Sequence, residues 1–514
     1  MAKAFLRISL LAVLLPSFLS CKHDRLLPKP GEIVVGIEAS PSNLDPRLAR
    51  DAYAVQILPL VFPGLFEIGD NYEPKPNLVS EYAQLSDTSY IFHLKPGIKF
   101  SNGKPLSAQD VKATLESLKL PGINSPYAEL MDRIKSIEIL DPLSLKLELT
   151  EPFAPILVQL CIGILPAELA QNQSSPGIKD LIGAGPFRVE SFEPGSRVVL
   201  SQNPFYTEPK PYFERIEFRV IPEDTTRILS LEKGEIQLLQ NPVPVDELAR
   251  LKSNPALRVL EREGVNYTYL GFNFRDPVLK NILVRKAIAY AINRDELIGC
   301  LLKGTVFKAN TLLSPRHWAF EPDVITYNYD PELAKKLLDL AGYPDPDEDG
   351  PKPRFKLIYK TSMNQQRIWI AQAIADQLKK VGIEVEVRSL EFGTLFADIQ
   401  AGNFQIYTLT WVGVIEPDIF YNIFHSASVP PKGANRGRYS NTRLDSLLEK
   451  ARRAKNREER RMLYAEIQKI LSAELPYISL WYSNDLVVSD KRLVGFEPGP
   501  GGEWTGLANA RWKE

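Results

Sequence analysis

Few residues in this chain have the types and spacing that catalytic or metal chemistry needs. Its four histidines are scattered along the sequence, at His23, His93, His317 and His425. None has a His or Cys partner at the spacing of a zinc or haem site. The sequence also lacks a Gly-x-Ser-x-Gly nucleophile motif, a phosphate loop and a dinucleotide fingerprint. We therefore predict a protein that is not an enzyme and that holds neither a metal nor a cofactor.

One acid pair, Glu416 and Asp418, has the residue types of a general acid and a general base. Surface carboxylates are so common that a solvated pair is the simpler interpretation. A secreted hydrolase stays as a remote alternative, which turnover of a generic substrate by the purified protein would support.

The charge balance excludes some classes of partner. The chain contains 62 Lys and Arg and 63 Asp and Glu, so no broad basic field is available to attract nucleic acid. Arginines are frequent between residues 436 and 461, but glutamates alternate with them, which is typical of solvated helix faces. With 514 residues, 44% of them hydrophobic, the chain is long enough for roughly two to four globular domains.

The N-terminus has the layout of an export signal. Two basic residues precede an apolar run over residues 8–15, which is too short to span a bilayer. The segment Phe18–Cys21 resembles the bacterial lipobox, although leucine is usual where this chain has phenylalanine. We predict a signal peptide over 1–20, a lipid on Cys21 that anchors the protein to a membrane outside the cytoplasm, and a tether over 21–30. An ordinary signal peptide with a chance cysteine is the alternative.

The other two cysteines have a structural interpretation. Cys161 and Cys300 both lie in apolar runs, so we expect small buried side chains. The division into domains given below places the two cysteines in different parts of the molecule, so we expect no disulfide between them.

Hydrophobic periodicity predicts an α/β protein. Gly31–Glu38 is expected to be a buried strand that ends in a turn-rich loop, and Ser107 to cap a helix. An amphipathic helix over 367–380 is followed by a glycine and a strand over 383–387, which is one α/β unit. Residues 477–488 are expected to form another strand.

Several separated segments resemble one family, the bacterial extracellular solute-binding proteins of the dipeptide, oligopeptide and nickel type (family 5), which serve ABC importers. The longest match is Phe92–Val111. The matching segments are 41–46, 61–67, 92–111, 183–187, 270–273 with 284–294, and 435–441 with 444–445. Each is short, but their common order across nearly the whole mature chain makes the set specific.

The resemblance implies an α/β, two-lobed periplasmic-binding-protein fold (type II, large cluster C-like) with an extra α+β domain inserted in the N-terminal lobe. The implied parts are lobe I (31–55, 182–275 and 484–514), the extra domain (56–181) and lobe II (276–483). Two segments, near 273–276 and 483–488, would join the lobes. A ligand would bind in the cleft between them and be buried by hinge closure.

The resemblance also implies partners and contacts. A monomer would capture its ligand and hand it, unchanged, to the permease and ATPase subunits of an importer. The implied ligand contacts are Ala39, Ser40, Pro41, Gly271, Phe272, Asn273, Trp411, Val412, Gly413, Asn435, Arg436 and Tyr482. Trp411, at the end of a strand over 404–411, would form an apolar wall, with a place in the core as the alternative. The alternative for Arg436 is a surface ion pair.

One departure from the family bears on the ligand. Peptide-binding members commonly carry an aspartate just after this tryptophan, where it pairs with a peptide's ammonium group. This chain has Gly413 there, and only Glu416 or Asp418 lies near enough in sequence to substitute. A buried ammonium without an anionic partner is costly, so we expect free peptides to bind poorly. Strand addition by backbone groups would still accept an extended ligand, and a blocked peptide, a sugar-like solute, an opine or a metal chelate stays open.

A second function from a different class needs the same fold. A ligand sensor would use the same cleft closure to signal to a membrane partner. Neighbouring genes for two permeases and two ATPases would favour import, whereas a neighbouring sensor kinase would favour signalling.

Overall fold

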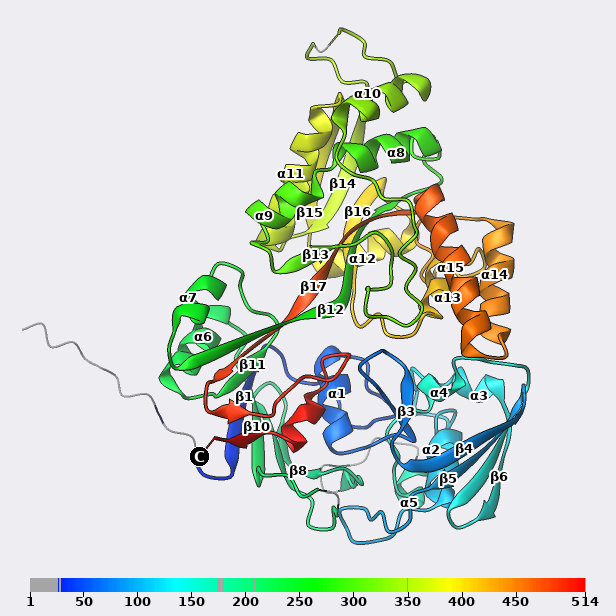
Figure 1. The fold of residues 1–514 in the computed structure, drawn as a ribbon, viewed down its shortest axis with the longest axis vertical. Helices are drawn as coiled ribbons and strands as arrows, with labels where there is room; N and C mark the ends of the chain where they lie inside the picture. Colours follow the sequence, from blue (N-terminus) through cyan, green and yellow to red (C-terminus); the bar gives the residue numbers. More distant parts are fainter. Residues whose placement is uncertain are drawn as a thin grey trace, which may run out of the picture.

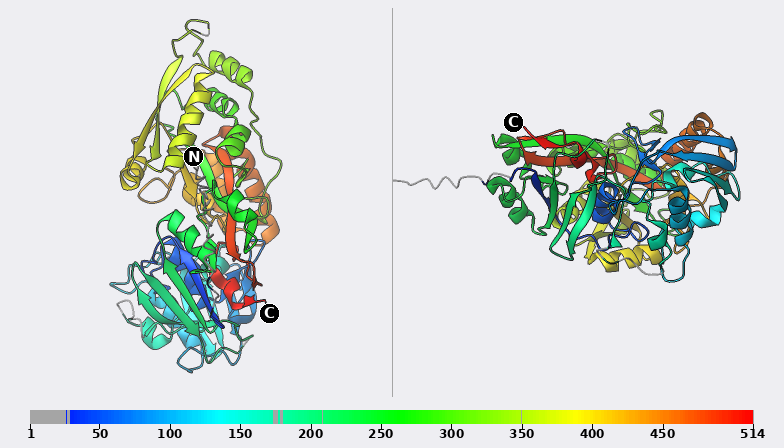
Figure 2. Two further views of the ribbon diagram at one scale, coloured as in Figure 1. Left: turned by 90° about the vertical axis from the view of Figure 1, so that its left-hand side faces the viewer. Right: turned by 90° about the horizontal axis from the view of Figure 1, so that it is seen from below.

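The computed structural model describes Leu26 and residues 29–172, 177, 180–207, 209–348 and 350–513. The predicted signal peptide and the predicted lipid on Cys21 lie outside these residues. The chain forms a broad lower part and a narrower upper part (Figure 1). Two long strands, β12 (Leu257–Phe272) and β17 (Tyr477–Asp490), run through both parts. Seen from the side, the two parts are stacked one above the other (Figure 2).

The elements fall into three groups along the chain. Lobe I contains β1 (Glu32–Ile37), α1 (Ala52–Ile57), the 3-10 turn η1 (Leu58–Leu60), β8 (Phe187–Glu193), β9 (Arg197–Gln202), β10 (Arg215–Val220), α6 (Asp224–Lys233), β11 (Leu238–Gln240), α7 (Leu248–Ser253), β18 (Leu493–Val494), the 3-10 turn η3 (Trp504–Ala508) and β19 (Arg511–Trp512). The extra domain contains β2 (Phe66–Ile68), β3 (Pro74–Pro76), β4 (Val79–Ser86), β5 (Ser89–Leu94), α2 (Ala108–Ser117), α3 (Leu130–Arg133), β6 (Ile134–Asp141), β7 (Ser144–Leu149) and α4 (Ile156–Gln159), and α5 (Ala167–Ala170) follows it. Lobe II contains α8 (Ile282–Ala291), α9 (Arg294–Cys300), β13 (Val306–Lys308), α10 (Pro331–Leu340), β14 (Phe355–Ser362), α11 (Gln365–Lys379), β15 (Ile383–Leu390), α12 (Phe392–Ala401), β16 (Ile406–Trp411), α13 (Ile419–Phe424), α14 (Thr442–Arg453) and α15 (Arg457–Glu474).

One sheet links the two lobes. Its strand order is β15-β14-β16-β12-β17-β11-β1-β10-β9-β8, with β13 beside β17. The predicted α/β unit of lobe II is confirmed, since α11 connects β14 to the parallel strand β15. The predicted strand after residue 31 is confirmed as β1, and the predicted cap at Ser107 begins α2 with a capping box to Asp110.

The lobes are joined covalently by β12 and β17. The pairing of these two strands shifts register between Glu263 and Asn266, and the carbonyl oxygen of Ser483 would lie only 2.4 Å from a Cβ added to Gly264. A larger residue at Gly264 would push the strands apart at the crossing. Beyond this point β12 continues through Tyr267–Phe272, where it pairs with β16 of lobe II. The predicted joining segments near 273–276 and 483–488 stay predictions.

The hydrophobic cores follow this division. Lobe I packs around β1, β9 and β10, and lobe II packs helices on both faces of β12, β14 and β16. The core of the extra domain runs from Leu65 to Ile164 with Ala184, around the four-stranded sheet β4-β5-β7-β6. Ile57–Phe62 and, later in the chain, Leu165, Ala170 and Leu181 pack in the same core as β1, while the range of 56–181 for the extra domain stays a prediction.

The cysteines only partly match the prediction. Both are free thiols, and Cys161 is half-buried. Cys300 is exposed, which corrects the expectation of a buried side chain. It ends α9, whose buried residues are Arg294 and Leu297, so the last turn presents Cys300 to solvent. Among the described residues, no helix is both long and apolar enough to cross a bilayer.

Candidate ligand-binding cleft

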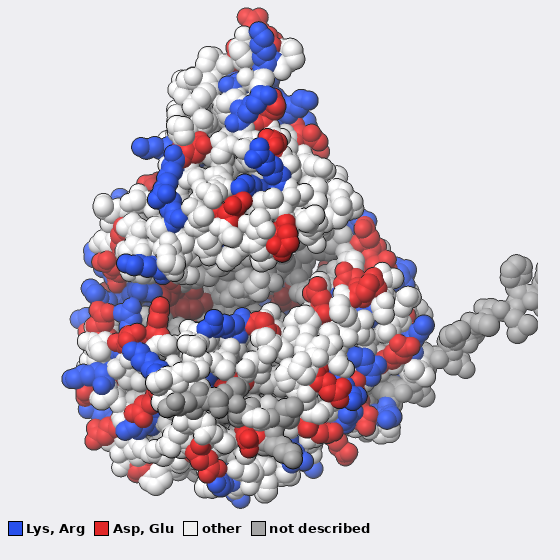
Figure 3. Space-filling model, turned by 180° about the vertical axis from the view of Figure 1, so that it is seen from behind, with Lys and Arg blue, Asp and Glu red and all other residues white. Residues whose placement is uncertain are grey.

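Strand direction determines what faces the space between the lobes. Strands β1, β10, β11 and β12 run the same way, and β12 leads from lobe I into lobe II. Strands β14, β15 and β16 run the opposite way, toward lobe I. The carboxyl ends of strands from both lobes therefore point at each other, which is where open α/β sheets bind ligands. Figure 3 shows the surface hollowed between the two lobes.

The loop after β1 starts at the carboxyl end of that strand. Ala39 is exposed, Ser40 is half-buried and Pro41 is buried. The loop is held from below by the ion pair between Asp45 and Arg47, whose side chains are both fully buried. The loop that carries Ala39 and Ser40 is therefore fixed at its C-terminal side, which limits its loss of freedom on any binding event.

Trp411 ends β16 at the carboxyl end of that strand, and Val412 and Gly413 follow it. Trp411 is half-buried, Val412 is 65% exposed and Gly413 has a φ of +65°. The amide N–H of Gly413 donates to Asn266 Oδ1 over 2.9 Å. No heavy atom lies within 4 Å of a Cβ added to Gly413, so this position opens into free space.

Arg436 supports the tryptophan from within lobe II. Its guanidinium carbon lies 4.6 Å from the centre of the Trp411 ring and 5.2 Å from that of Phe396, and its Nη1 donates to the Tyr269 hydroxyl over 3.0 Å. Within the described part of the chain, no carboxylate forms an ion pair with it. The surface ion pair considered for Arg436 is therefore replaced by a buried cation–π stack that orients Trp411.

Lobe II exposes several large apolar side chains. Met363, Phe392 and Val412 follow the carboxyl ends of β14, β15 and β16, and Trp369 lies in α11; they are exposed by 49–65%. Val55 of α1, in lobe I, is exposed as well. Exposed apolar side chains gathered at one end of a sheet are typical of a ligand or partner surface.

The two acids considered as substitutes for the missing aspartate are occupied. Asp418 accepts from Arg452 through both oxygens, at 2.7 and 2.8 Å. Glu416 accepts from Arg460, and both side chains are largely buried. Neither carboxylate is available to an ammonium group at Gly413, and both serve to fix the loop after β16.

A separate contact joins lobe II to the extra domain. The Tyr72 ring stacks on His317 with centroids 5.8 Å apart and planes at 7°. His317 Nδ1 accepts from the Ala319 N–H at 3.0 Å, so Nε2 carries the proton and donates to the Ile415 carbonyl at 2.8 Å. Burial lowers the pKa of His317 to about 4, so the ring is neutral at pH 7. Ion pairs, such as that between Arg453 and Glu151 at 3.0 Å, add to the same interface.

A cavity of about 340 Å³ lies where lobe I, the extra domain and lobe II meet. Val55 lines it from lobe I, Cys161 from the extra domain and Ile415 from lobe II. The turn Pro500–Glu503 near the C-terminus closes one side. This volume lies within the range of small-molecule sites. Among the described residues, no group of His, Cys, Asp and Glu side chains is arranged to hold a metal ion.

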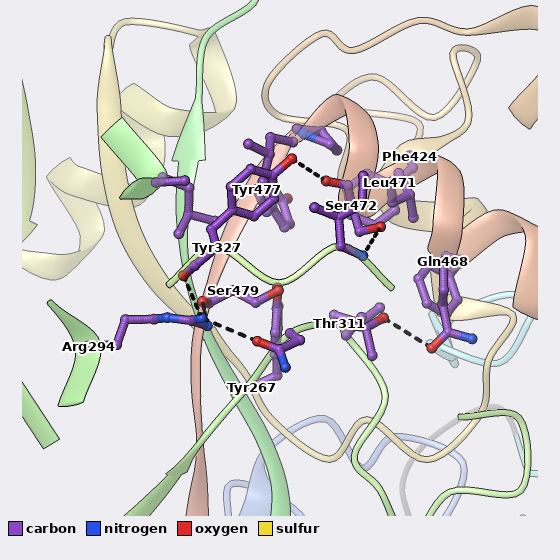
Figure 4. A pocket seen from close by; sticks show the side chains of 18 residues that line it. Tyr267, Arg294, Thr311, Tyr327, Phe424, Gln468, Leu471, Ser472, Tyr477 and Ser479 are labelled. Atoms are coloured by element: carbon purple, nitrogen blue, oxygen red, sulfur yellow. Dashed lines mark hydrogen bonds between the residues drawn. The ribbon is translucent and has the colours of Figure 1, made fainter. Parts of the chain in front are cut away.

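A second, smaller cavity of about 40 Å³ lies inside lobe II (Figure 4). It has room for about one water molecule, so it is no solute site. Arg294 lines it and donates to the carbonyl oxygens of Ala309, Ser479 and Tyr327 and to Asn310 Oδ1. Burial lowers the pKa of Arg294 to about 10. The guanidinium thus binds three segments of lobe II, and among the described residues no carboxylate accepts a hydrogen bond from it.

Replacing Arg294 with methionine should destabilise lobe II by about 2–4 kcal/mol, because buried carbonyl groups would lose their donors. Urea unfolding followed by tryptophan fluorescence measures this change. Arg388→Met is the matched control, since Arg388 forms only an exposed pair with Glu386 and should cost less than about 0.5 kcal/mol. Equal effects of the two substitutions would contradict this role for Arg294.

Comparison with known proteins agrees with this architecture. Residues 73–430, more than half of the chain, match the family described as bacterial extracellular solute-binding proteins, family 5 Middle. The chain belongs to this family. The predicted two-lobed binding-protein fold with an inserted α+β domain is thereby confirmed.

Individual members resemble this family 5 protein over most of their length. The dipeptide-binding protein of Escherichia coli (strain K12) is 27% identical over 496 residues, which cover 91% of this chain and 92% of that protein. Oligopeptide-binding AppA from Bacillus subtilis, solved with a nonapeptide, has a TM-score of 0.76 and 26% identity, covering 95% of this chain and 100% of that one. NikZ from Campylobacter jejuni, solved with Ni(L-His), has a TM-score of 0.80 and 25% identity, covering 94% and 100%. The ligands of these relatives differ in class, so membership of family 5 does not decide the ligand here.

Five of the predicted contacts lie inside lobe II of this family 5 protein. Gly271 and Phe272 are buried in β12, and Asn273 donates to the carbonyls of Gly402 and Phe404. Asn435 donates to backbone carbonyls around its own loop, and the buried hydroxyl of Tyr482 donates to those of Thr311 and Leu313. The structure thus moves Gly271, Phe272, Asn273, Asn435 and Tyr482 from the cleft to the lobe interior. Of the remaining predicted contacts, Ala39 and Val412 are exposed, Ser40, Trp411 and Gly413 are half-buried, and Pro41 is buried.

Sequence reasoning missed the cavity below Ile415. Residues 499–502 looked like a plain loop, and Cys161 like a core residue. The cluster of glycines and proline there was the one available signal, since it marks close approach of backbone to another surface. No feature of the sequence distinguishes Glu503, the carboxylate that follows this cluster.

Proposed function

We propose that this family 5 protein captures a small solute in the cleft between its lobes and delivers it, chemically unchanged, to the permease of an ABC importer. The observation that carries the proposal is the convergence of strand ends from both lobes on one cleft, with two strands as the covalent hinge. Such an arrangement binds by closing on its ligand. The division into lobe I (31–55, 182–275 and 484–514), extra domain (56–181) and lobe II (276–483) belongs to the same proposal.

The proposed contacts are the exposed parts of the two walls. Ala39, Ser40 and Pro41 would meet the ligand from below, and Trp411, Val412 and Gly413 from above. Arg436 is a positioning residue that orients Trp411. Backbone groups of these two segments are suited to an extended ligand, while the ring of Trp411 and the exposed apolar side chains around it suit an apolar group.

The test is native mass spectrometry of the purified protein. We expect a bound small molecule that is released on unfolding. Trp411→Ala should lower the affinity for that molecule at least about tenfold, whereas Trp411→Phe should keep most of it, because an aromatic ring accounts for about 1–3 kcal/mol at such a wall. Unchanged affinity in Trp411→Ala would contradict the proposed upper wall.

Free dipeptides and tripeptides should bind poorly. Gly413 offers no carboxylate, and the nearest acids are paired with Arg452 and Arg460. A peptide ammonium at Gly413 would be buried without an anion, and the carboxylate of a free peptide would find no Lys, Arg or His among the described residues that line the cavity beside Ile415. In a thermal-shift screen of unmodified peptides we expect rises in midpoint of less than about 1 °C; rises of several degrees with many peptides would show that another group replaces the aspartate.

We also propose that a lipid on Cys21 holds the protein at the membrane surface. The support is the cysteine at the end of a signal-like segment. Cell fractionation provides the test: the native chain should remain with membranes, and Cys21→Ser should be released. Equal distribution of the two would contradict the anchor.

A further inference from the structure

The cavity under Ile415 has an unusual charge pattern. Its walls are mostly aliphatic and aromatic, and two carboxylates, Glu67 and Glu503, are present among them. Among the described residues that line it, none is Lys, Arg or His. Glu67 pairs with the outward-facing Lys75 at 3.0 Å. The question is therefore which cation, if any, pairs with Glu503.

Glu503 is held in place without a cation. Its Oε2 accepts from the Gly501 N–H over 2.9 Å, and a Cβ on Gly499 or Gly501 would clash with its carboxyl group. In the described residues, no Lys or Arg forms an ion pair with it. The nearby Arg262 is already engaged by Asp485 and by the carbonyls of Pro498 and Gly499. The carboxylate is thus oriented by the chain but not neutralised by it.

The turn that carries Glu503 contacts lobe II. Ile415 Cδ1 of lobe II would lie 2.9 Å from a Cβ on Gly501, so the turn that carries Glu503 touches the loop after Trp411. Burial raises the pKa of the Glu503 carboxyl, while backbone N–H groups and the charge of Arg262 oppose that change. A cation next to the carboxylate would relieve this cost of burial.

We infer that the solute of this protein carries a positively charged group attached to an apolar body, and that Glu503 pairs with that group inside the cavity. The inference rests on the proposed function. It names the ligand class: the cavity adjoins the proposed contacts through Ile415, two residues after Gly413, and the anion that anchors the ligand comes from the C-terminal turn. Val55, Ile415 and the aliphatic walls would enclose the apolar body.

Three probes with the same phenethyl group test which ligand charge the cavity prefers. Phenethylamine is cationic, 2-phenylethanol is neutral and 3-phenylpropanoate is anionic. Isothermal titration calorimetry measures the affinity of each. We expect the amine to bind at least about tenfold more tightly than the alcohol, and the anion to bind most weakly, since an ion pair in a low-dielectric site is worth that much or more. Equal affinity for the amine and the alcohol would overturn the inference.

The variant Glu503→Gln tests whether Glu503 recognises the charge of the ligand or only supports the turn that carries it. The variant should lose the preference for the amine, to within about twofold, and keep its affinity for the alcohol. Loss of both would mean that Glu503 only shapes the turn, and this would overturn the inference. Glu497→Gln removes the same charge from an exposed position on the same C-terminal segment and should keep the preference. Thermal unfolding of each variant checks that it folds, and Glu503→Asp serves if the glutamine variant does not.

The released solute distinguishes failure of this inference from failure of the proposed function. A solute with a basic amine or another fixed positive charge in the native mass spectrum would support the inference. A neutral or anionic solute would overturn it and leave the cleft function standing. Absence of any bound solute, with no binding of the three probes, would overturn both.

Discussion

Arg460→Met is expected to destabilise lobe II by about 3–5 kcal/mol. The side chains of Arg460 and Glu416 are 8% and 16% exposed, and the guanidinium also lies against the rings of Trp318 and Tyr464. Burial already raises the pKa of Glu416, against the opposing effect of Arg460. Removing the arginine alone leaves a buried carboxylate without its partner, which is the costly way to break such a pair. Urea unfolding monitored by tryptophan fluorescence gives the change.

The neighbouring Arg461 is the control for this prediction. It pairs only with the exposed Glu458, so Arg461→Met should cost less than about 0.5 kcal/mol. The double substitution Arg460→Met with Glu416→Gln should recover part of the loss, because no buried charge then remains. A cost for Arg460→Met no larger than that of the control would show that the pair does not fix the loop after β16.

Lowering the pH from 6.5 to 4 should remove about 3 kcal/mol of stability through His317 alone. The folded-state pKa of His317 is lowered to about 4, chiefly by burial, and the Arg457 and Arg460 charges act in the same direction. The ordinary value is about 6.5. Between these values the unfolded chain binds more protons than the folded one, so the free energy of unfolding falls as the pH falls through this window. Protonation would also add charge where His317 stacks on Tyr72.

The difference between the native chain and His317→Phe isolates this effect. Phenylalanine keeps a ring against Tyr72 but has no proton to gain, so its pH profile should be shallower by about 3 kcal/mol over the window. Carboxylates that titrate in both proteins cancel in the difference. Parallel profiles, or an NMR titration of His317 with a midpoint near 6.5, would be inconsistent with the buried neutral ring.

Local features of the fold could be predicted from the sequence because they depend on neighbouring residues. The capping box at Ser107 and the helix–strand unit before Ile383 are of this kind. The crossing of β12 could not be located. A strand that continues from one core into the next keeps the same alternation on both sides, and only its partners change at Gly264. Cys300 was misplaced because its apolar neighbours did not reveal which face of α9 is covered.

Some residues of the candidate site could likewise be predicted from the sequence, and others could not. Trp411 and the loop after β1 could be proposed because strand ends face clefts in this fold. The role of Arg436 could not, since its aromatic partners Phe396 and Tyr269 come from other elements. Glu503 lies far along the chain from Cys161 and Ile415, and only the folded structure brings the three to one cavity.

The distance across the cleft tests the central claim most directly. Leu229 of α6 in lobe I and Leu340 of α10 in lobe II are exposed and lie outside the proposed ligand contacts, so each can carry a spin label on an introduced cysteine, in a chain whose native cysteines are replaced by serine. Pulsed electron paramagnetic resonance then measures the label separation without and with the small-molecule fraction released from the denatured protein. Hinge closure on a solute predicts a separation that shortens by several ångströms. A separation that does not change while the fraction binds would contradict it.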